Sequence, residues 1–295
     1  MSSLKRKIKY LFKPIPDPST GIITGEKIQL LCDHFLGDKE DASKNPLLWR
    51  KQYKWTYFEN LNAPFNNDSR IFCYMDTLCK LDLLIEKLQW MENPFLLVFH
   101  TYDTGFKKHH LKLFENLPKL KKIFAQNLDV SHEKVTPLPI GIANTQFAHG
   151  KLSAINQVRD QQLKKENLIY FNFSIDTNVE KRVECYQKIS EKGVEFQSRI
   201  NFEDYIHSLS RYKFAICPEG NGIDTYRFWE CLYLRVVPIC KKNLLTEYFS
   251  QYFPVLLLDD WEDLDLSRLE DTYPSFKWDN FDKLDMSYYK KLLTL

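Results

Sequence analysis

The chain has 295 residues, of which 44% are hydrophobic and 15% aromatic, enough for one large packed domain or two of ordinary size. Its 41 basic and 39 acidic residues leave a formal charge of +2, which argues against a general nucleic-acid binder. No apolar run is long enough for a transmembrane segment. The seven cysteines lack paired metal-ligand spacing and several lie in apolar segments, which favours reduced thiols in a cytoplasmic protein.

The N-terminal segment 4–12 is basic, and it is too short and too charged for a secretory signal. Its pattern fits either a solvated first strand or helix, or an interfacial segment that makes weak contact with a membrane surface.

The first half of the chain alternates strand and helix signals, which predicts a parallel sheet covered by helices on both faces. The expected strands are 27–32, 70–74, 94–100, 121–126 and 134–138, with a helix over 77–90.

Polar residues follow two of these strands, so we expect them at the carboxyl edge of the sheet. Asp33 ends the first strand together with His34, while His100 and Asp103 follow the most apolar one. A carboxylate or imidazole at this edge can take a proton from an acceptor hydroxyl, which makes Asp103 and His100 the candidate catalytic residues. The alternatives are a buried strand-end histidine and an aspartate that only caps a turn.

The second half follows a polar, charged connector over 143–166 and repeats the alternation of strands and helices. Strands are expected at 168–173, 213–217, 236–240 and 255–258, and helices at 178–192, 202–210 and 244–252. Two Rossmann-like halves follow from this pattern.

The most informative stretch, 214–239, reads as strand, glycine loop, helix and strand. Its polar residues are expected at the carboxyl edge of a parallel sheet, where open α/β sheets bind nucleotides. A carboxylate there can hold ribose hydroxyls, and an arginine with a helix N-terminus can hold a diphosphate. Glycines allow close backbone approach, and a carboxyl or hydroxyl side chain caps the helix. The expected donor-binding residues are Glu219, Gly220, Asn221, Gly222, Asp224, Thr225, Arg227 and Glu230.

The run Pro218-Glu-Gly-Asn-Gly-Ile-Asp-Thr-Tyr-Arg-Phe-Trp-Glu230, followed by an apolar Val-Pro-Ile strand, resembles the donor-binding signature of exostosin-like glycosyltransferases. It is similar, more loosely, to the pattern of α-1,3-fucosyltransferases, with Arg227 in place of their phosphate-binding lysine. The exostosin-like family usually has a small residue, often glycine, near Arg235, and this departure bears on packing more than on chemistry. The motif covers about a tenth of the chain.

The resemblance implies an α/β fold of two Rossmann-like domains of the GT-B type that face each other across a cleft. Residues 1–150 would bind the acceptor and residues 151–295 the nucleotide-sugar, with the tail 288–295 expected to pack back on the first domain. The soluble exostosin-like enzymes of large algal viruses, which this chain resembles in lacking an anchor, make UDP-xylose our best guess for the donor. The partners would be a UDP-sugar, pentose or hexose, and a glycan or glycoprotein acceptor.

Further polar residues are candidates for the cleft. Arg182 lies one turn into the helix expected after 168–173 and is a candidate diphosphate ligand, although a surface arginine would show the same pattern. The turn 138–150 resembles a Pro-Ile-Gly…His-Gly segment of the same family, and a plain interdomain crossover explains it equally well. The additional cleft candidates are Asp33, Gly141, Asn144, His149, Thr177 and Arg199.

Two spacing arguments bear on the reaction. Glu219 and Glu230 are eleven positions apart, which does not match the glutamate pair of retaining two-domain transferases, so we expect inversion. Asp263 and Asp265 lie in an acidic stretch late in the chain, which favours an acidic helix start over metal ligands. We therefore expect no metal and no cofactor.

The sequence thus predicts a metal-independent, inverting glycosyltransferase. Two other functions stay open: a fucosyltransferase-like enzyme that uses a GDP-sugar, and a non-catalytic nucleotide- or sugar-binding module that has lost the base.

Overall fold

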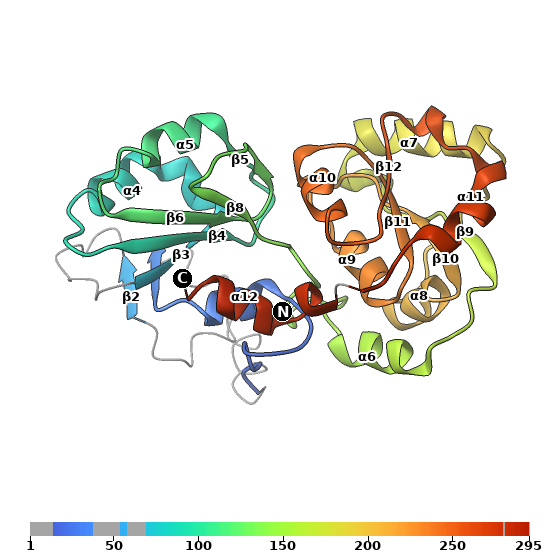
Figure 1. The fold of residues 1–295 in the computed structure, drawn as a ribbon, viewed down its shortest axis with the longest axis horizontal. Coiled ribbons are helices and arrows are strands. Elements are labelled where there is room, and N and C mark those ends of the chain that lie inside the picture. Colours follow the sequence, from blue (N-terminus) through green and yellow to red (C-terminus); the bar gives the residue numbers. More distant parts are fainter. Residues whose placement is uncertain (1–13, 38–53, 58–68, 280, 295) are drawn as a thin grey trace. The chain divides into compact units, whose positions relative to one another are not determined.

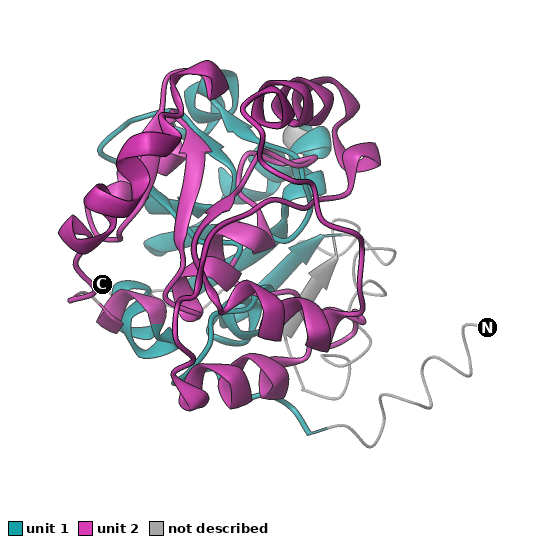
Figure 2. Cartoon of the chain, turned by 90° about the vertical axis from the view of Figure 1, so that its right-hand side faces the viewer, with its two compact units in different colours: residues 1–140, 285–295 teal, residues 141–284 magenta. Residues whose placement is uncertain are grey.

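The computed structural model describes residues 14–37, 54–57, 69–279 and 281–294, so the basic segment 4–12 lies outside the described residues. The chain divides into two compact units (Figures 1 and 2). Unit 1 runs to Ile140 and also takes in the residues from Asp285 onward, and unit 2 is Gly141–Leu284. We expected the boundary at residue 150. It lies earlier, because the turn after Ile140 belongs to unit 2, where the Phe147 amide donates a hydrogen bond to the Asn144 carbonyl at 2.9 Å.

The described part of unit 1 contains a parallel sheet in the order β2-β1-β3-β4-β6-β8. Its strands are β1 (His34–Gly37), β2 (Lys54–Tyr57), β3 (Ser69–Tyr74), β4 (Phe95–His100), β6 (Leu120–Ala125) and β8 (Val135–Pro137). The four strands expected at 70–74, 94–100, 121–126 and 134–138 are confirmed. The chain goes from β1 out to β2 and returns to β3 on the other side of β1, so the strand order reverses between β1 and β3.

The other elements of unit 1 connect these strands or cover the sheet. They are α2 (Gly25–Leu30), η2 (Met75–Lys80), α4 (Leu81–Leu88), α5 (Lys108–Phe114), α12 (Met286–Leu292) and the paired short strands β5 (Phe106–Lys107) and β7 (Leu128–Asp129). The C-terminal helix α12 belongs to the unit 1 core, where Met286, Tyr289 and Leu293 are buried beside Ile23 and Phe124.

The prediction of a strand over 27–32 is wrong, because this segment lies mostly in helix α2. Thr24 caps this helix, since its Oγ1 accepts a hydrogen bond from the Lys27 amide at 3.3 Å. Every residue of α2 is buried, including Glu26, Lys27 and Gln29, so its polar residues do not mark a solvent-exposed helix face. The first strand of the sheet instead begins at His34.

Unit 2 contains a parallel sheet in the order β12-β11-β10-β9 in its described part. Its strands are β9 (Asn167–Tyr170), β10 (Tyr212–Ile216), β11 (Val237–Lys241) and β12 (Leu256–Leu258). Its helices are α6 (Leu152–Gln161), η3 (Ile175–Thr177), α7 (Val179–Glu191), α8 (Phe202–Leu209), α9 (Tyr226–Tyr233), α10 (Leu244–Ser250), η4 (Trp261–Asp263), α11 (Leu266–Thr272), η5 (Tyr273–Ser275) and η6 (Phe281–Leu284). The expected strands and helices of the second half are confirmed within a few residues of their predicted ends.

In unit 2 the four strands lie in chain order, and the chain reverses at β9 through a segment that is not itself a strand. The Gln197 amide donates to the Phe171 carbonyl at 2.8 Å, so the segment after α7 runs beside the outer edge of β9. The chain then returns through α8 to β10 on the opposite side of β9. The crevice at a reversal, outside the carboxyl ends of the two strands, is where open α/β sheets bind ligands. In unit 2 these are the ends of β9 and β10.

None of the described helices has both the length and the apolar character needed to cross a membrane.

Candidate functional site

Two arginines converge on the loop that follows β9. Arg182 comes from α7 and donates from Nη1 to the Ser174 carbonyl at 2.7 Å. Arg227 comes from α9 and donates from Nη1 to the Asn172 carbonyl at 2.6 Å. Two cations from different helices therefore contact the loop at the carboxyl end of β9.

Arg182 is buried without a carboxylate partner among the described residues. Only 8% of its surface is exposed, and its second hydrogen bond runs from Nε to the Glu219 carbonyl at 2.9 Å. Burial lowers its pKa to about 10, and the neighbouring charge of Arg227 adds to this effect. A buried guanidinium that is balanced only by carbonyl oxygens is an attractive position for an anion.

Arg227 packs against two neighbouring aromatic rings. Its guanidinium carbon is 4.6 Å from the ring centroid of Tyr205 and 5.5 Å from that of Tyr170, within cation–π range. Its Nε atom is buried and has no hydrogen-bond partner among the described residues, and it lies 3.9 Å from Glu230 Oε2.

Glu230 is the carboxylate next to Arg227. It is 5% exposed and accepts a 2.6 Å hydrogen bond from the Tyr205 hydroxyl. Burial raises the pKa of Glu230, and the charge of Arg227 and the bond from Tyr205 partly offset that rise. Glu230 and Arg182 line neither cavity described below, whereas we expected both to contact the donor.

The loop after β10 directs Glu219 away from the arginines. Its carboxylate forms an ion pair with Lys181 and accepts a hydrogen bond from Asn243 Nδ2 at 3.0 Å, while its backbone carbonyl accepts one from Arg182. Gly220 follows, and a side chain there would place its Cβ 3.2 Å from Arg182 Nη2. Gly220 is thus required for space next to Arg182.

The start of α9 differs from expectation in its capping. Thr225 is the N-cap residue, but its side chain makes no capping bond. Asp224 is buried and accepts from Trp229 Nε1 at 2.8 Å. The first amides of α9 therefore have no capping bond from the Thr225 side chain, and a bound anion can use them. Asn221 is exposed, and Gly222 is buried with its carbonyl bonded to the Gly220 amide at 3.1 Å.

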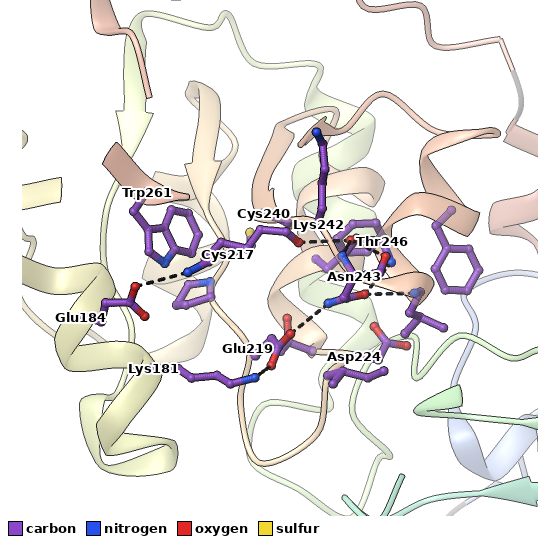
Figure 3. A pocket seen from close by; sticks show the side chains of 17 residues that line it. Lys181, Glu184, Cys217, Glu219, Asp224, Cys240, Lys242, Asn243, Thr246 and Trp261 are labelled. Carbon is purple, nitrogen blue, oxygen red and sulfur yellow. Dashed lines mark hydrogen bonds and ion pairs between the residues drawn. The ribbon is translucent and has the colours of Figure 1, made fainter. Parts of the chain in front are cut away.

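The first cavity, of about 220 Å³, lies on the β11 side of this loop (Figure 3). Lys181, Glu219 and Asn243 form one connected polar group on its wall, and Figure 3 shows the bonds that join them. The apolar lining comes from Cys217, Ile223, Phe228, Cys240, Leu245, Phe249 and Trp261. A compact cavity with a few fixed polar groups over an apolar floor is typical of small-molecule sites.

The second cavity, of about 560 Å³, lies on the β9 side of Arg227. Tyr170, Asn172 and Tyr205 line it together with Arg227. Two other expected residues join them. His149 has its ring centroid 5.5 Å from that of Tyr226, and Arg199 is exposed and makes no ion pair with a described residue. This lining combines aromatic faces with Arg199, Arg227 and the ion pair of Lys151 with Glu203.

Three other expected cleft residues have structural roles. Gly141 adopts a left-handed backbone with φ +66, and Asn144 is buried with its carbonyl only 2.1 Å from where a Cβ on Gly150 would lie. Both shape the turn that opens unit 2, and neither lines the two cavities. Thr177, half-buried in η3, has its methyl group 3.6 Å from the Cβ position of Gly220, and Asn178 is the residue that caps α7.

His100 does not have the geometry of a general base. It is 1% exposed, its Nδ1 accepts from the Thr101 amide at 2.8 Å, and its Nε2 is 2.9 Å from the Pro139 carbonyl. Nε2 therefore carries the proton, and both ring nitrogens are engaged. Burial lowers the pKa of His100 to about 4. The interpretation of a buried strand-end histidine fits this environment.

Asp103 is exposed in the turn that follows β4. Thr101 and Tyr102, which precede it, have φ of 63 and 89, a region that residues other than glycine rarely adopt and that clusters at functional sites. Asp76 is the second residue after β3, and its carboxylate accepts a hydrogen bond from Thr104 Oγ1 at 3.3 Å. The rule that pointed to Asp103, a carboxylate after an apolar strand, would also have found Asp76.

The predicted position of Asp33 at the carboxyl edge of the sheet is wrong. This residue lies before β1 and therefore at the amino edge of the sheet, because the strand that we expected to precede it is helix α2. Its carboxylate accepts from Arg70 Nη2 at 2.6 Å and Nε at 2.9 Å, and this bidentate pair lowers the pKa of Asp33. Asp33 is a structural residue at the edge opposite to the candidate base.

Sequence reasoning missed four residues at the unit 2 site: Asn172, Lys181, Tyr205 and Asn243. Asn172 and Asn243 each follow a strand by a residue or two, so their position was a readable signal. Lys181 and Tyr205 are surface-type positions on amphipathic helices, and nothing in their local pattern separates them from solvated residues.

Acidic residues late in the chain cap the starts of short helices. Asp265 Oδ1 accepts from the Ser267 amide at 3.0 Å at the start of α11, and Asp263 Oδ2 accepts from the Asp260 amide at 2.8 Å. The expected acidic helix start is confirmed. No cluster of three or more potential metal ligands occurs among the described residues.

No protein-family model matches the chain, and a search of curated proteins finds none with significant similarity. The resemblance to exostosin-like glycosyltransferases thus depends on the motif between Pro218 and Glu230.

Proposed function

We propose that this chain is an inverting glycosyltransferase that moves a sugar from a UDP-sugar to a hydroxyl of a glycan, with its two units in a GT-B arrangement. The single observation that carries the proposal is the pair of arginines that donate to the loop after β9. Arg182 has only carbonyl partners among the described residues, and Arg227 has a buried Nε without a hydrogen bond. Both features call for an anionic ligand with several acceptor oxygens.

The diphosphate of the donor binds between Arg182 and Arg227, with the start of α9 beside it. Charge builds up on the nucleoside diphosphate as it leaves the sugar, and fixed cations and helix amides stabilise that charge. This arrangement supplies what a divalent cation supplies in other transferases, so the proposed reaction needs no metal.

The two cavities flank the diphosphate position and divide the rest of the donor between them. The nucleoside enters the larger cavity, where Tyr170, Tyr205 and His149 offer aromatic faces. The sugar enters the smaller one, where the Glu219 carboxylate and the Asn243 amide are suited to hydroxyl groups. Glu219 thereby keeps the expected role of hydroxyl ligand.

Unit 1 supplies the general base and the acceptor site. Asp103 is an exposed carboxylate in a strained turn at the carboxyl edge of the sheet, and it takes the proton of the acceptor hydroxyl. The hydroxyl oxygen then attacks the anomeric carbon, and the bond from that carbon to the diphosphate oxygen breaks with inversion.

A donor screen tests the proposal. The purified chain is incubated with UDP-xylose, UDP-glucose, UDP-galactose and GDP-fucose, and release of free nucleotide is measured with and without glycan acceptors. Calorimetry with UDP and GDP runs in parallel. Turnover of a UDP-sugar together with tighter binding of UDP is the expected result. A GDP preference would move the chain to a fucosyltransferase-like class, and tight nucleotide binding without turnover of any donor would make it a binding module.

A further inference from the structure

Unit 1 has a concentrated basic surface, separate from the two unit 2 cavities. The segment 107–122, which we call the α5 basic segment, contains six lysines and one glutamate. Its formal charge is +5, whereas the whole chain carries +2, so the remaining residues are net negative. Among the described residues, the α5 basic segment is therefore a concentrated source of positive charge.

Most lysines of this segment are not neutralised by described residues. Five of them make no ion pair with a described residue: Lys107, Lys108, Lys112, Lys119 and Lys122. Exposed lysines of unit 2 are often paired, as in Lys151 with Glu203, Lys213 with Glu270 and Lys242 with Asp259. Five unpaired like charges within one short segment repel one another, and an anionic surface relieves that repulsion.

Helix α5 presents these charges on one face together with an apolar tip. Lys108 and Lys112 are four residues apart, and so are His109 and Leu113, and all four are exposed. The opposite face, with Leu111 and Phe114, is buried. Leu113 is 44% exposed, so the solvent face of α5 is both cationic and partly apolar.

A second apolar tip lies next to α5. Helices α4 and α5 are in contact and lie side by side on the same face of the unit 1 sheet (Figure 1). Trp90, two residues after α4 ends, is 78% exposed, the highest value among the exposed large hydrophobic residues. Tryptophan favours the headgroup region of a bilayer, where its ring is part apolar and its N–H still finds acceptors.

We propose that the α4–α5 face of unit 1 docks on an anionic lipid surface, with lysines of the α5 basic segment on the lipid headgroups and Trp90 and Leu113 in the interface. A soluble polyanion would use the lysines but gives no reason for two exposed apolar tips, which favours a lipid surface over a nucleic acid or an acidic glycan. Glu86 in α4, and Glu92 and Glu115 after the two helices, offset part of the positive charge. Two apolar side chains contribute little without the headgroup charges, so neutral membranes are not expected to bind.

Vesicle flotation tests this docking surface, using phosphatidylcholine vesicles with and without about one third phosphatidylglycerol, an anionic lipid. The wild-type chain should float only with the anionic vesicles, and high salt should release it. Lys108→Glu/Lys112→Glu should weaken the partition by about tenfold or more, since each lysine near an anionic surface contributes measurably. Trp90→Ala should weaken it several-fold.

The matched control is Lys164→Glu/Lys277→Glu, which changes the net charge equally at two exposed unit 2 lysines without ion pairs to described residues. It should float like the wild type. All substituted side chains are solvent-exposed, and thermal unfolding checks that each variant is folded. Equal loss in the control and the α5 variant would overturn the proposal, and so would binding to heparin or RNA without binding to anionic vesicles. Donor binding is measured separately, so failure of the docking surface leaves the proposed function untouched.

Discussion

Substituting Arg227 with methionine separates structural from ligand-binding contributions at the candidate site. The side chain is 18% exposed, it donates to the Asn172 carbonyl, and it is the nearest cation to the buried Glu230. Removing it leaves the Glu230 charge buried without compensation, which costs about 3 kcal/mol of folding free energy. The variant also loses a charge-assisted bond to the diphosphate of about 2 kcal/mol, so UDP should bind about thirtyfold more weakly.

The double variant Arg227→Met/Glu230→Gln distinguishes these two losses. Glutamine keeps an acceptor for the Tyr205 hydroxyl and removes the buried charge, so about half or more of the lost stability should return. UDP affinity should not return, because the cation that binds the phosphate is still absent.

Urea unfolding gives the stabilities, and calorimetry with UDP gives the affinities. Recovery of UDP affinity in the double variant would show that Arg227 acts only by supporting the fold. Wild-type affinity in the folded single variant would remove Arg227, and with it the placement of the diphosphate, from the site.

Three further perturbations test other parts of the site. Asp103→Asn should leave UDP binding nearly intact and reduce turnover by about two to four orders of magnitude, and near-normal turnover would direct attention to Asp76. Activity should persist in excess EDTA, and loss on chelation with recovery in manganese or magnesium would refute the proposed metal-independent stabilisation of the leaving group. His100, with its pKa lowered to about 4, binds its proton more readily in the unfolded chain, so its contribution to stability is complete above about pH 6.5 and declines toward pH 4. This contribution is about 3 kcal/mol, and His100→Gln should flatten the pH dependence of the unfolding free energy by that amount, whereas an unchanged profile would mean that His100 titrates normally.

The sequence by itself determined the α/β class, most strands and the stretch that forms the candidate site. Apolar runs such as 94–100 and 213–217 are long, bounded by polar residues and buried on both sides, so local pattern and tertiary environment agree there. The loop between Pro218 and Arg227 was readable for the same reason, because its glycines and polar residues interrupt two apolar runs. Arg227 was chosen from the motif, and Arg182 from its position one turn into the helix that follows the first strand of the second half.

Tertiary structure decided the features that local pattern leaves ambiguous. Helix α2 is buried on all sides, so the usual division into an apolar and a polar face does not mark it as a helix in the sequence. That misassignment also placed Asp33 at the wrong edge of the sheet. At the end of α9, Arg235 occupies a left-handed conformation with φ +54, which explains why glycine suits this position, and its guanidinium lies 4.8 Å from the Phe281 ring centroid.

The roles of individual side chains likewise depended on three-dimensional partners. Glu219 and Glu230 look equivalent in sequence, yet one faces a cavity and the other is buried against Tyr205. Which helix face reaches a ligand, and which carbonyl accepts from Arg182, depends on contacts between residues far apart in the chain. A linear pattern encodes the hydrophobic period of each element, and only packing fixes the direction in which each polar side chain points.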